Sequence, residues 1–128
     1  MRIPVVAAIL RDRAGRVLLA ERQKDSKFSG LWEFPGGKTE PSEASEEALS
    51  RELKEELGIE VTKVEKFLTL DHDYADRRVH IDFFLVTEWR GEPRPMDGQG
   101  LRWVLPREIN KEEILPANTA VVDALAGE

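Results

Sequence analysis

Three glutamates, Glu52, Glu55 and Glu56, fall within the stretch SRELKEELG at residues 50–58. In a helix these side chains would share one face, where like charges three and four positions apart repel each other by roughly 0.2–0.5 kcal/mol per pair. Clustered carboxylates are also the ligands that a hard cation such as Mg²⁺ selects, and a bound cation would remove the repulsion. The pattern therefore has two interpretations, a solvated acidic face or a divalent-metal site.

The residues around the cluster favour the metal site. Few lysines are interleaved with these glutamates, and Arg51 stands beside them. A glycine pair, Gly36-Gly37, precedes the helical pattern and would let the backbone approach a ligand closely. Carboxylates together with a backbone carbonyl form an oxygen-rich ligand set that suits Mg²⁺.

The spacing of these residues resembles the Nudix box, G-x5-E-x7-R-E-U-x-E-E-x-G-U, where U is a bulky aliphatic residue. Gly37 and Glu43 begin the match, and Arg51-Glu52-Leu53-Lys54-Glu55-Glu56-Leu57-Gly58-Ile59 completes it at every specified position. On these residues the chain resembles the Nudix hydrolase family. The resemblance implies an α/β fold of the α+β type, in which a mixed sheet lies between helices.

The resemblance further implies hydrolysis of a nucleoside diphosphate linked to another moiety, with Mg²⁺, or else Mn²⁺, as cofactor. Arg51 would orient the glutamates, Glu43 would brace the loop and helix of the box, and Glu52 is the first choice of base. Asp97, in MDGQG, is the second choice of base or a further ligand; its alternative is an ordinary turn aspartate before Gly98. The implied catalytic residues are Glu52, Arg51, Glu55 and Asp97, the implied metal ligands are Gly36 (through its carbonyl), Glu52, Glu55, Glu56 and Asp97, and the structural box residues are Gly37, Glu43, Arg51 and Gly58.

Outside the box the chain resembles the MutT-type branch, which hydrolyses 8-oxo-dGTP to the monophosphate and pyrophosphate. The likeness includes EFPGGK, WRGEP and PAN. It implies that Phe34 lines a base pocket and that Asn118 reads the purine edge, although Asn118 could instead cap the last helix. The substrate-binding set expected from this likeness is Arg22, Phe34, Gly37, Lys38, Arg77 and Asn118.

Two alternatives to the hydrolysis of 8-oxo-dGTP remain open. The first seventy residues also resemble bacterial pyrophosphohydrolases that act on CTP and modified pyrimidine nucleotides. The second alternative is a catalytically silent module that binds a nucleotide, and the complete set of box glutamates disfavours it.

The elements that must position these residues can be read from hydrophobic periodicity. A helix is expected from Ser42, as N-cap, to Leu57, with a leucine stripe facing inward and Gly58 as the stop. The first two strands, 5–10 and 17–20, should form a hairpin. Further strands are expected at 32–34, 61–70, 79–85 and 101–104, and a last helix at 116–125.

Composition narrows the functional classes. The chain has 128 residues, which predicts a single domain over 1–128, and its net charge of −6 argues against a protein that coats nucleic acid polymers. The absence of cysteine excludes disulfides, thiolate ligands and a cysteine nucleophile, and suits a reducing compartment. The apolar run at 5–10 is too short for a signal peptide or membrane span. A cytoplasmic enzyme is expected, monomeric or homodimeric, with a nucleoside triphosphate as its partner and no membrane.

Overall fold

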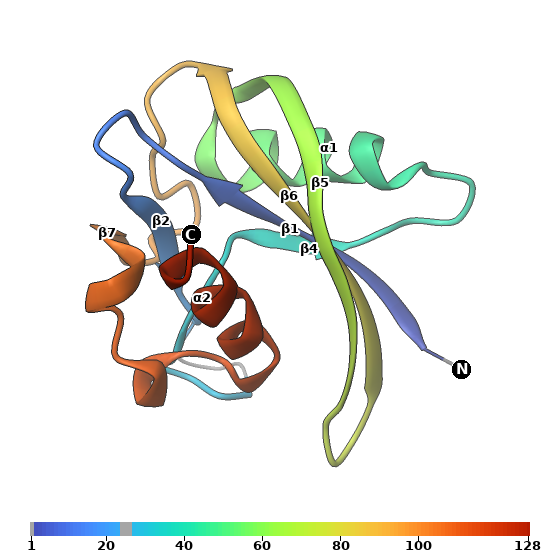
Figure 1. Cartoon of the computed structure of the whole chain (residues 1–128). Helices are drawn as coiled ribbons and strands as arrows, with labels where there is room; N and C mark the ends of the chain where they lie inside the picture. The colour runs from blue at the N-terminus through green and yellow to red at the C-terminus, as the bar shows by residue number, and fades with distance from the viewer. Residues whose placement is uncertain (1, 24–26) are drawn as a thin grey trace.

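The computed structural model describes residues 2–23 and 27–128, and it contains two sheets and two α-helices (Figure 1). The strands are β1 (Ile3–Leu10), β2 (Val17–Glu21), β3 (Trp32–Glu33), β4 (Gly36–Lys38), β5 (Glu60–Asp73), β6 (Arg78–Arg90) and β7 (Leu101–Val104). The helices are α1 (Ser45–Leu57) and α2 (Thr119–Ala126), and three short 3₁₀ turns cover Pro106–Glu108, Lys111–Glu113 and Pro116–Asn118.

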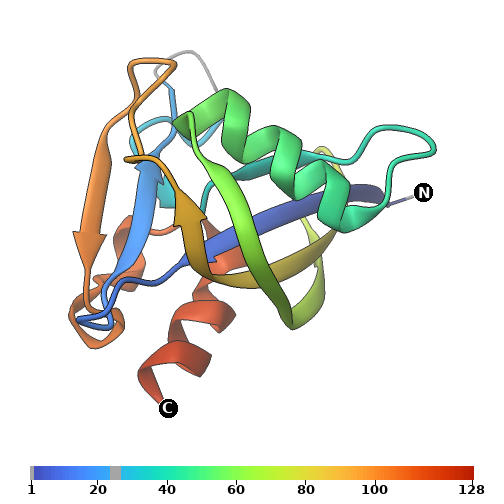
Figure 2. The same cartoon turned by 90° about the horizontal axis from the view of Figure 1, so that it is seen from above.

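The larger sheet is mixed, as expected, and has the strand order β4-β1-β6-β5. Strands β1 and β6 run parallel, with Val5 opposite Ile81, whereas β4 and β5 join antiparallel at the two edges. Helices α1 and α2 lie on opposite sides of this sheet (Figure 2). The predicted sheet between helices is therefore confirmed.

A second, three-stranded antiparallel sheet, β3-β2-β7, was not expected. The predicted hairpin of the first two strands is wrong: β1 pairs with β4 and β6, while β2 pairs with β3 and β7. A single bridge between Arg11 and Val17 is what remains of the hairpin. Hydrophobic strands that are buried on both faces can satisfy their backbones in either sheet, so local sequence does not fix the partner.

The alternation of side chains along β1 divides the core into two layers. Val6, Ala8 and Leu10 pack with the α1 leucines, Leu49, Leu53 and Leu57, which are all fully buried. Ala7 and Ile9 point to the other side, toward Val121, Val122 and Leu125 of α2. The leucine stripe thus fixes the rotation of α1, and with it the direction in which the glutamates point.

Helix α1 begins later than its sequence suggests. The expected N-cap, Ser42, instead has a φ of 67°, and Ala44 precedes the first helical residue. The carboxylate of Glu47 accepts the N–H of Ala44 at 2.9 Å, and Glu43 similarly accepts the N–H of Glu40. Ala44 has no side-chain acceptor for the N–H groups of the first turn, so only the half of a capping box that Glu47 supplies is formed. The end is as expected, with Gly58 in the left-handed conformation at φ 68°.

Over the described residues, none of the helices has the length and apolar content required to cross a membrane.

Candidate active site

Arg51 gathers several carboxylates at the α1 surface. Its guanidinium donates to both oxygens of Glu43, at 2.8 and 3.0 Å, to Glu52 at 3.0 Å and to Glu55 at 3.5 Å. It also donates to the carbonyl of Lys38 at 3.1 Å, which ties the helix to β4. The hydrogen bonds from Arg51 hold the pKa of Glu43 at about 2, and those to Glu43 and Glu52 raise the pKa of Arg51 itself.

Gly37 makes room for the carboxylate of Glu52. A Cβ atom at Gly37 would overlap the Glu52 side chain, and one at Gly36 would overlap the backbone of Val6 and Ala7 in β1. The two glycines thus serve different purposes. Gly36 allows β4 to pair closely with β1, and Gly37 allows Glu52 to lie directly over the strand.

Glu56 lies next to Glu52 and is largely buried. Burial, followed by a hydrogen bond and repulsion from Glu52, raises the pKa of Glu56 to about 9; the charges of Glu33 and Asp97 act in the same direction. The Oε2 atom of Glu56 is buried and has no hydrogen-bond partner. A buried carboxyl oxygen without a partner is costly unless something supplies positive charge or a donor.

These observations fit a divalent cation. The donors are all oxygens, and the orphan Glu56 oxygen lies next to a second carboxylate, which is chemistry that suits a hard cation. The third helix glutamate, Glu55, is 60% exposed and turned toward Arg51. Within residues 2–23 and 27–128, no group of three acidic or histidine side chains converges on one point as a complete metal site. The roles of Glu55 and of the Gly36 carbonyl as ligands stay predictions.

Asp97 reaches this region from the long loop between β6 and β7. It lines a small cavity together with Glu56, Glu33, Arg22 and Gln99. It also stands in a turn, in which Gly98 has a φ of 76° and donates to the carbonyl of Pro95. The turn that was the alternative interpretation of Asp97 is therefore present, and it brings the residue to the cavity; its role as base or metal ligand stays a prediction.

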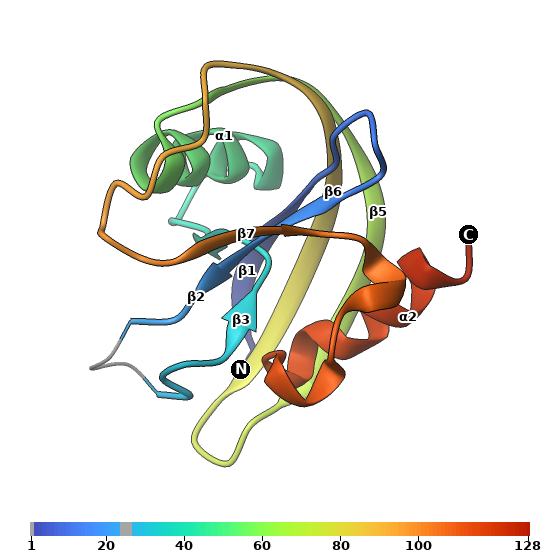
Figure 3. The same cartoon turned by 90° about the vertical axis from the view of Figure 1, so that its left-hand side faces the viewer.

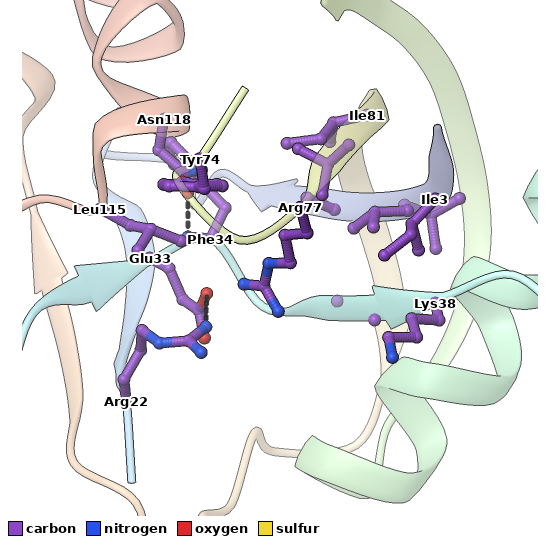
Figure 4. A pocket seen from close by; sticks show the side chains of 16 residues that line it. Ile3, Arg22, Glu33, Phe34, Lys38, Tyr74, Arg77, Ile81, Leu115 and Asn118 are labelled. Carbon is purple, nitrogen blue, oxygen red and sulfur yellow. Dashed lines mark hydrogen bonds and ion pairs between the residues drawn. The ribbon is translucent and has the colours of Figure 1, made fainter. Parts of the chain in front are cut away.

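A neighbouring cavity of about 190 Å³ lies between β1, β4, β6 and the segment that precedes α2 (Figure 4). Its lining combines apolar side chains on the sheet with cationic ones at the rim. The predicted substrate-binding residues all line it: Arg22, Phe34, Gly37, Lys38, Arg77 and Asn118. The structure therefore brings together residues that are spread over most of the sequence, and their roles toward a ligand stay predictions.

Asn118 does not cap the last helix. Its side chain makes no capping hydrogen bond, and its Oδ1 atom accepts the backbone N–H of Phe34 at 3.0 Å. The residue is buried, with 4% of its surface exposed. Because an N–H requires an acceptor, the amide oxygen must face Phe34, and the amide NH₂ is the part that can act as a donor.

Glu33 was not predicted from the sequence, yet it lines both cavities together with Arg22. The two residues form an ion pair at 2.9 Å, which stands between the cavities. Burial raises the pKa of Glu33 although Arg22 opposes that shift. Its place in the short strand before the glycine pair was the available signal, because alternation with Trp32 and Phe34 gives it a distinct face.

Tyr74 and Arg77 close the cavity from the turn between β5 and β6. The Tyr74 hydroxyl accepts the N–H of Ala117 at 3.1 Å, which joins this turn to the segment before α2. The Arg77 guanidinium lies 5.5 Å from the Tyr74 ring centroid, and its Nε atom is buried without a partner. Figure 4 shows Arg77 extending into the space between the Arg22–Glu33 pair and Lys38. Tyr74 and Arg77 thus both form part of the cavity wall.

Comparison with known proteins gives a consistent result. Residues 5–124 match the NUDIX domain. An 8-oxo-dGTP diphosphatase of Proteus vulgaris is 45% identical over 71% of this chain and 81% of its own length. A CTP pyrophosphohydrolase of Escherichia coli is 40% identical over 95% of this chain and 90% of its own.

Solved structures agree with the sequence relatives. A MutT structure from work on Aliivibrio salmonicida and Vibrio cholerae has a TM-score of 0.85 and 36% identity, covering 98% of this chain and 97% of that one. The E. coli ORF135 protein has a TM-score of 0.86 and 39% identity, covering 99% and 91%. Both solved structures thus share the architecture of this chain.

Proposed function

The chain belongs to the Nudix family and is a hydrolase of that family, and from this premise we propose that it is a Mg²⁺-dependent nucleoside triphosphate pyrophosphohydrolase. Its preferred substrate in this proposal is 8-oxo-dGTP, which it would convert to 8-oxo-dGMP and pyrophosphate. Such a reaction removes an oxidised nucleotide before it can enter DNA, so the enzyme would serve DNA repair by sanitising the nucleotide pool.

One observation carries the proposal. The apolar cavity with its cationic rim adjoins the cavity that contains Glu56 and Asp97, and both share Arg22 and Glu33. A ligand with a flat base at one end and a polyphosphate at the other has the matching order of chemical groups. The base would lie near Phe34 and Asn118, the sugar near the Arg22–Glu33 pair, and the phosphates toward the α1 glutamates.

The metal in this proposal is held by Glu52 and Glu56, with Glu55, Asp97 and the Gly36 carbonyl as further ligands. A divalent cation at such a site neutralises phosphate oxygens and lowers the pKa of a bound water. The all-oxygen donors suit both Mg²⁺ and Mn²⁺. We take Mg²⁺ as the cofactor because it commonly holds substrate phosphates in proteins.

Side chains of the protein would then accept the proton of the attacking water and orient the reacting groups. Glu52 accepts the proton of the attacking water, and the hydrogen bond from Arg51 at 3.0 Å fixes the direction of its carboxylate. Asp97 is the second candidate for this role because it borders the same cavity as Glu56. Arg77 and Lys38 would contact phosphate or sugar oxygens from the opposite rim.

The orientation of Asn118 supports an oxidised purine. With Oδ1 occupied by the Phe34 N–H, the side chain presents its NH₂ group as a donor. An oxidised guanine offers two carbonyl oxygens, O6 and O8, to such a donor, whereas cytosine has one carbonyl oxygen and an exocyclic amino group that is itself a donor. The alternative, hydrolysis of CTP or a modified pyrimidine nucleotide, is supported by the 40% identical E. coli CTP pyrophosphohydrolase. A silent binding module is disfavoured because every box glutamate is present.

The test is a Mg²⁺-dependent hydrolysis screen of 8-oxo-dGTP, dGTP, CTP and 5-methyl-dCTP, with pyrophosphate and phosphate measured separately. We expect the highest kcat/KM for 8-oxo-dGTP, with release of pyrophosphate. A higher kcat/KM for CTP would make the pyrimidine alternative correct. Release of phosphate would show that attack occurs at another phosphorus, and no hydrolysis of any nucleotide would favour the silent module.

We also propose that residues 1–128 act as one domain in the cytoplasm, as a monomer or homodimer, without a membrane or nucleic acid polymer as partner. The two core layers share the single sheet β4-β1-β6-β5, which supports one cooperative unit. Light scattering coupled to gel filtration would give the oligomeric state, and coincident unfolding transitions by fluorescence and circular dichroism would test the single domain.

A further inference from the structure

The loop between β6 and β7 returns to the C-terminal end of α1 (Figure 3). The last carbonyls of an α-helix have no partners within the helix. Here the loop supplies them: the N–H of Arg94 donates to the carbonyl of Leu57 at 2.9 Å, and the N–H of Met96 donates to the carbonyl of Glu56 at 3.1 Å. The loop that carries Asp97 is therefore attached to the helix that carries the glutamates.

The side chain of Gln99 completes this attachment. Its Nε2 atom donates to the carbonyl of Glu56 at 3.2 Å, and its Oε1 atom accepts the N–H of Asp97 at 3.0 Å. One amide group thus joins the backbones of two acidic residues that line the same cavity. On the other side of the loop, Gln23 donates to the carbonyl of Asp97 at 3.0 Å.

This arrangement limits the movement of Asp97 relative to Glu56. The two residues line one small cavity, but they come from different parts of the fold. Glu56 is fixed by α1, but Asp97 lies on an exposed loop. Without a tether at its backbone, the Asp97 segment could relax away from the helix, and its carboxylate would leave the cavity.

We propose that Gln99 is a positioning residue, which holds the Asp97 carboxylate beside Glu56 by binding the backbone of both. The inference rests on the proposed function, because it gives Gln99 a role through Asp97 in the metal and phosphate site. It adds a residue outside the Nudix box to the machinery, and it predicts that an uncharged side chain controls metal affinity.

The test compares Gln99→Met, which keeps the length of the side chain and removes both hydrogen bonds, with Gln99→Ala, which removes the same amide without apolar bulk. The matched control is Asn110→Ala, which removes a similar side-chain hydrogen bond, from the N–H of Glu112 at 3.0 Å, on a turn away from the site. Three quantities are measured: the Kd for Mg²⁺ or Mn²⁺ by calorimetry without nucleotide, hydrogen exchange of the Asp97 amide, and kcat and KM separately.

Both Gln99 variants should raise the metal Kd by about three- to tenfold, as expected for the loss of one or two hydrogen bonds. Exchange of the Asp97 amide should accelerate, and kcat should fall by a similar factor while KM changes by less than about twofold. Asn110→Ala should leave all three unchanged. In an Asp97→Asn background, Gln99→Met should add no further weakening of metal binding, because the residue through which it acts is already altered.

Two results would overturn the inference. One is a metal Kd for the Gln99 variants equal to that of Asn110→Ala, and the other is full additivity with Asp97→Asn. Failure of the proposed function is recognised differently, by a wild-type protein that neither binds Mg²⁺ nor releases pyrophosphate. In that case hydrogen exchange in the metal-free protein still decides the inference, since a fast-exchanging Asp97 amide in the wild type would contradict the tether.

Discussion

At the scale of single residues, the side chain of Glu52 interacts with several other parts of the candidate site. It receives a hydrogen bond from Arg51 at 3.0 Å, lies in the space left by Gly37 and contacts Glu56. Glu52→Gln keeps the shape of the side chain but removes its charge and its capacity to take a proton. We expect kcat to fall by at least about a hundredfold, because metal placement or base function is lost.

The matched control for this prediction is Glu46→Gln, an exposed glutamate in the first turn of the same helix. Its kcat should equal that of the wild type. Steady-state kinetics at saturating Mg²⁺ measures both variants, and unchanged turnover in Glu52→Gln would remove this residue from the mechanism.

Asn118 allows an isosteric test of base recognition. Asn118→Asp keeps an oxygen that can accept the Phe34 N–H, which favours the ionised carboxylate, but it loses the NH₂ donor. We expect kcat/KM for 8-oxo-dGTP to fall about tenfold or more, the usual effect of an unsatisfied hydrogen bond. The ratio of activities should shift toward CTP, because a carboxylate can accept from the cytosine amino group.

Asn110→Asp serves as the control for that change, since it retains the acceptor for the Glu112 N–H on a surface turn. Competition between 8-oxo-dGTP and CTP in one reaction gives the ratio of kcat/KM directly. An unaltered ratio in Asn118→Asp would show that Asn118 holds Phe34 in place and does not read the base.

At the scale of elements, the junction of β4 with α1 contains two neighbouring glycines, and we expect substitution of one to affect stability and of the other to affect activity. Gly36→Ala would place a methyl group against the β1 backbone at Val6, which has no means of moving aside. We expect a loss of about 1–3 kcal/mol in unfolding free energy, as for other overpacked sites. Gly37→Ala would instead meet the end of the flexible Glu52 side chain, so the fold should tolerate it better while kcat falls.

Urea unfolding and steady-state kinetics on the two variants test this division. The decisive comparison is the order of the effects, with Gly36→Ala the less stable variant and Gly37→Ala the folded but impaired one. The reverse order would mean that Glu52 does not depend on the space above Gly37.

The same elements show what could be predicted from sequence. Helix α1 and its inward face followed from the leucine period, because that signal is local and repeated over the whole helix. The site residues were grouped by resemblance, and those for substrate all line one cavity. The N-cap of α1 was mispredicted because Ser42 adopts a left-handed turn and Ala44 takes the N-cap position. Glu33 was missed because its pair with Arg22 depends on the pairing of β2 with β3. Contacts across the sheets, such as Asn118 with Phe34, leave no local pattern.

At the scale of the whole molecule, the carboxylates make stability depend on pH in two opposite ways. The pKa of Glu43 is lowered from 4.5 to about 2 by hydrogen bonds from Arg51, so its contribution is present above pH 4.5 and is lost as pH falls toward 2. Burial raises the pKa of Asp82, but hydrogen bonds from Thr69 and Ser45 together with the charges of Lys66 and His80 lower it overall, which adds to the same loss in acid.

Glu56 makes the stability of the metal-free protein depend on pH in the opposite direction. Its pKa is raised from 4.5 to about 9 by burial and by Glu52, so the metal-free folded state holds a proton that the unfolded state has already released. Between pH 4.5 and 9 the folded protein binds more protons, and its stability therefore falls as pH rises, by at most about 1.4 kcal/mol per pH unit for this one group. The metal-free protein should be most stable in mildly acidic solution, near the lower end of that window.

Mg²⁺ should reverse this trend, because a cation at Glu56 replaces the proton and binds the ionised form. We expect the gain in unfolding free energy on adding Mg²⁺ to increase from pH 5 to pH 9, in line with the linkage between ligand and fold. Urea unfolding at several pH values, in EDTA and in Mg²⁺, measures the gain. In Glu56→Gln the metal-free decline above pH 4.5 should flatten and the Mg²⁺ gain should shrink, whereas Glu46→Gln should preserve both. A Mg²⁺ gain that is independent of pH, or one that survives in Glu56→Gln, would place the cation away from this buried carboxylate.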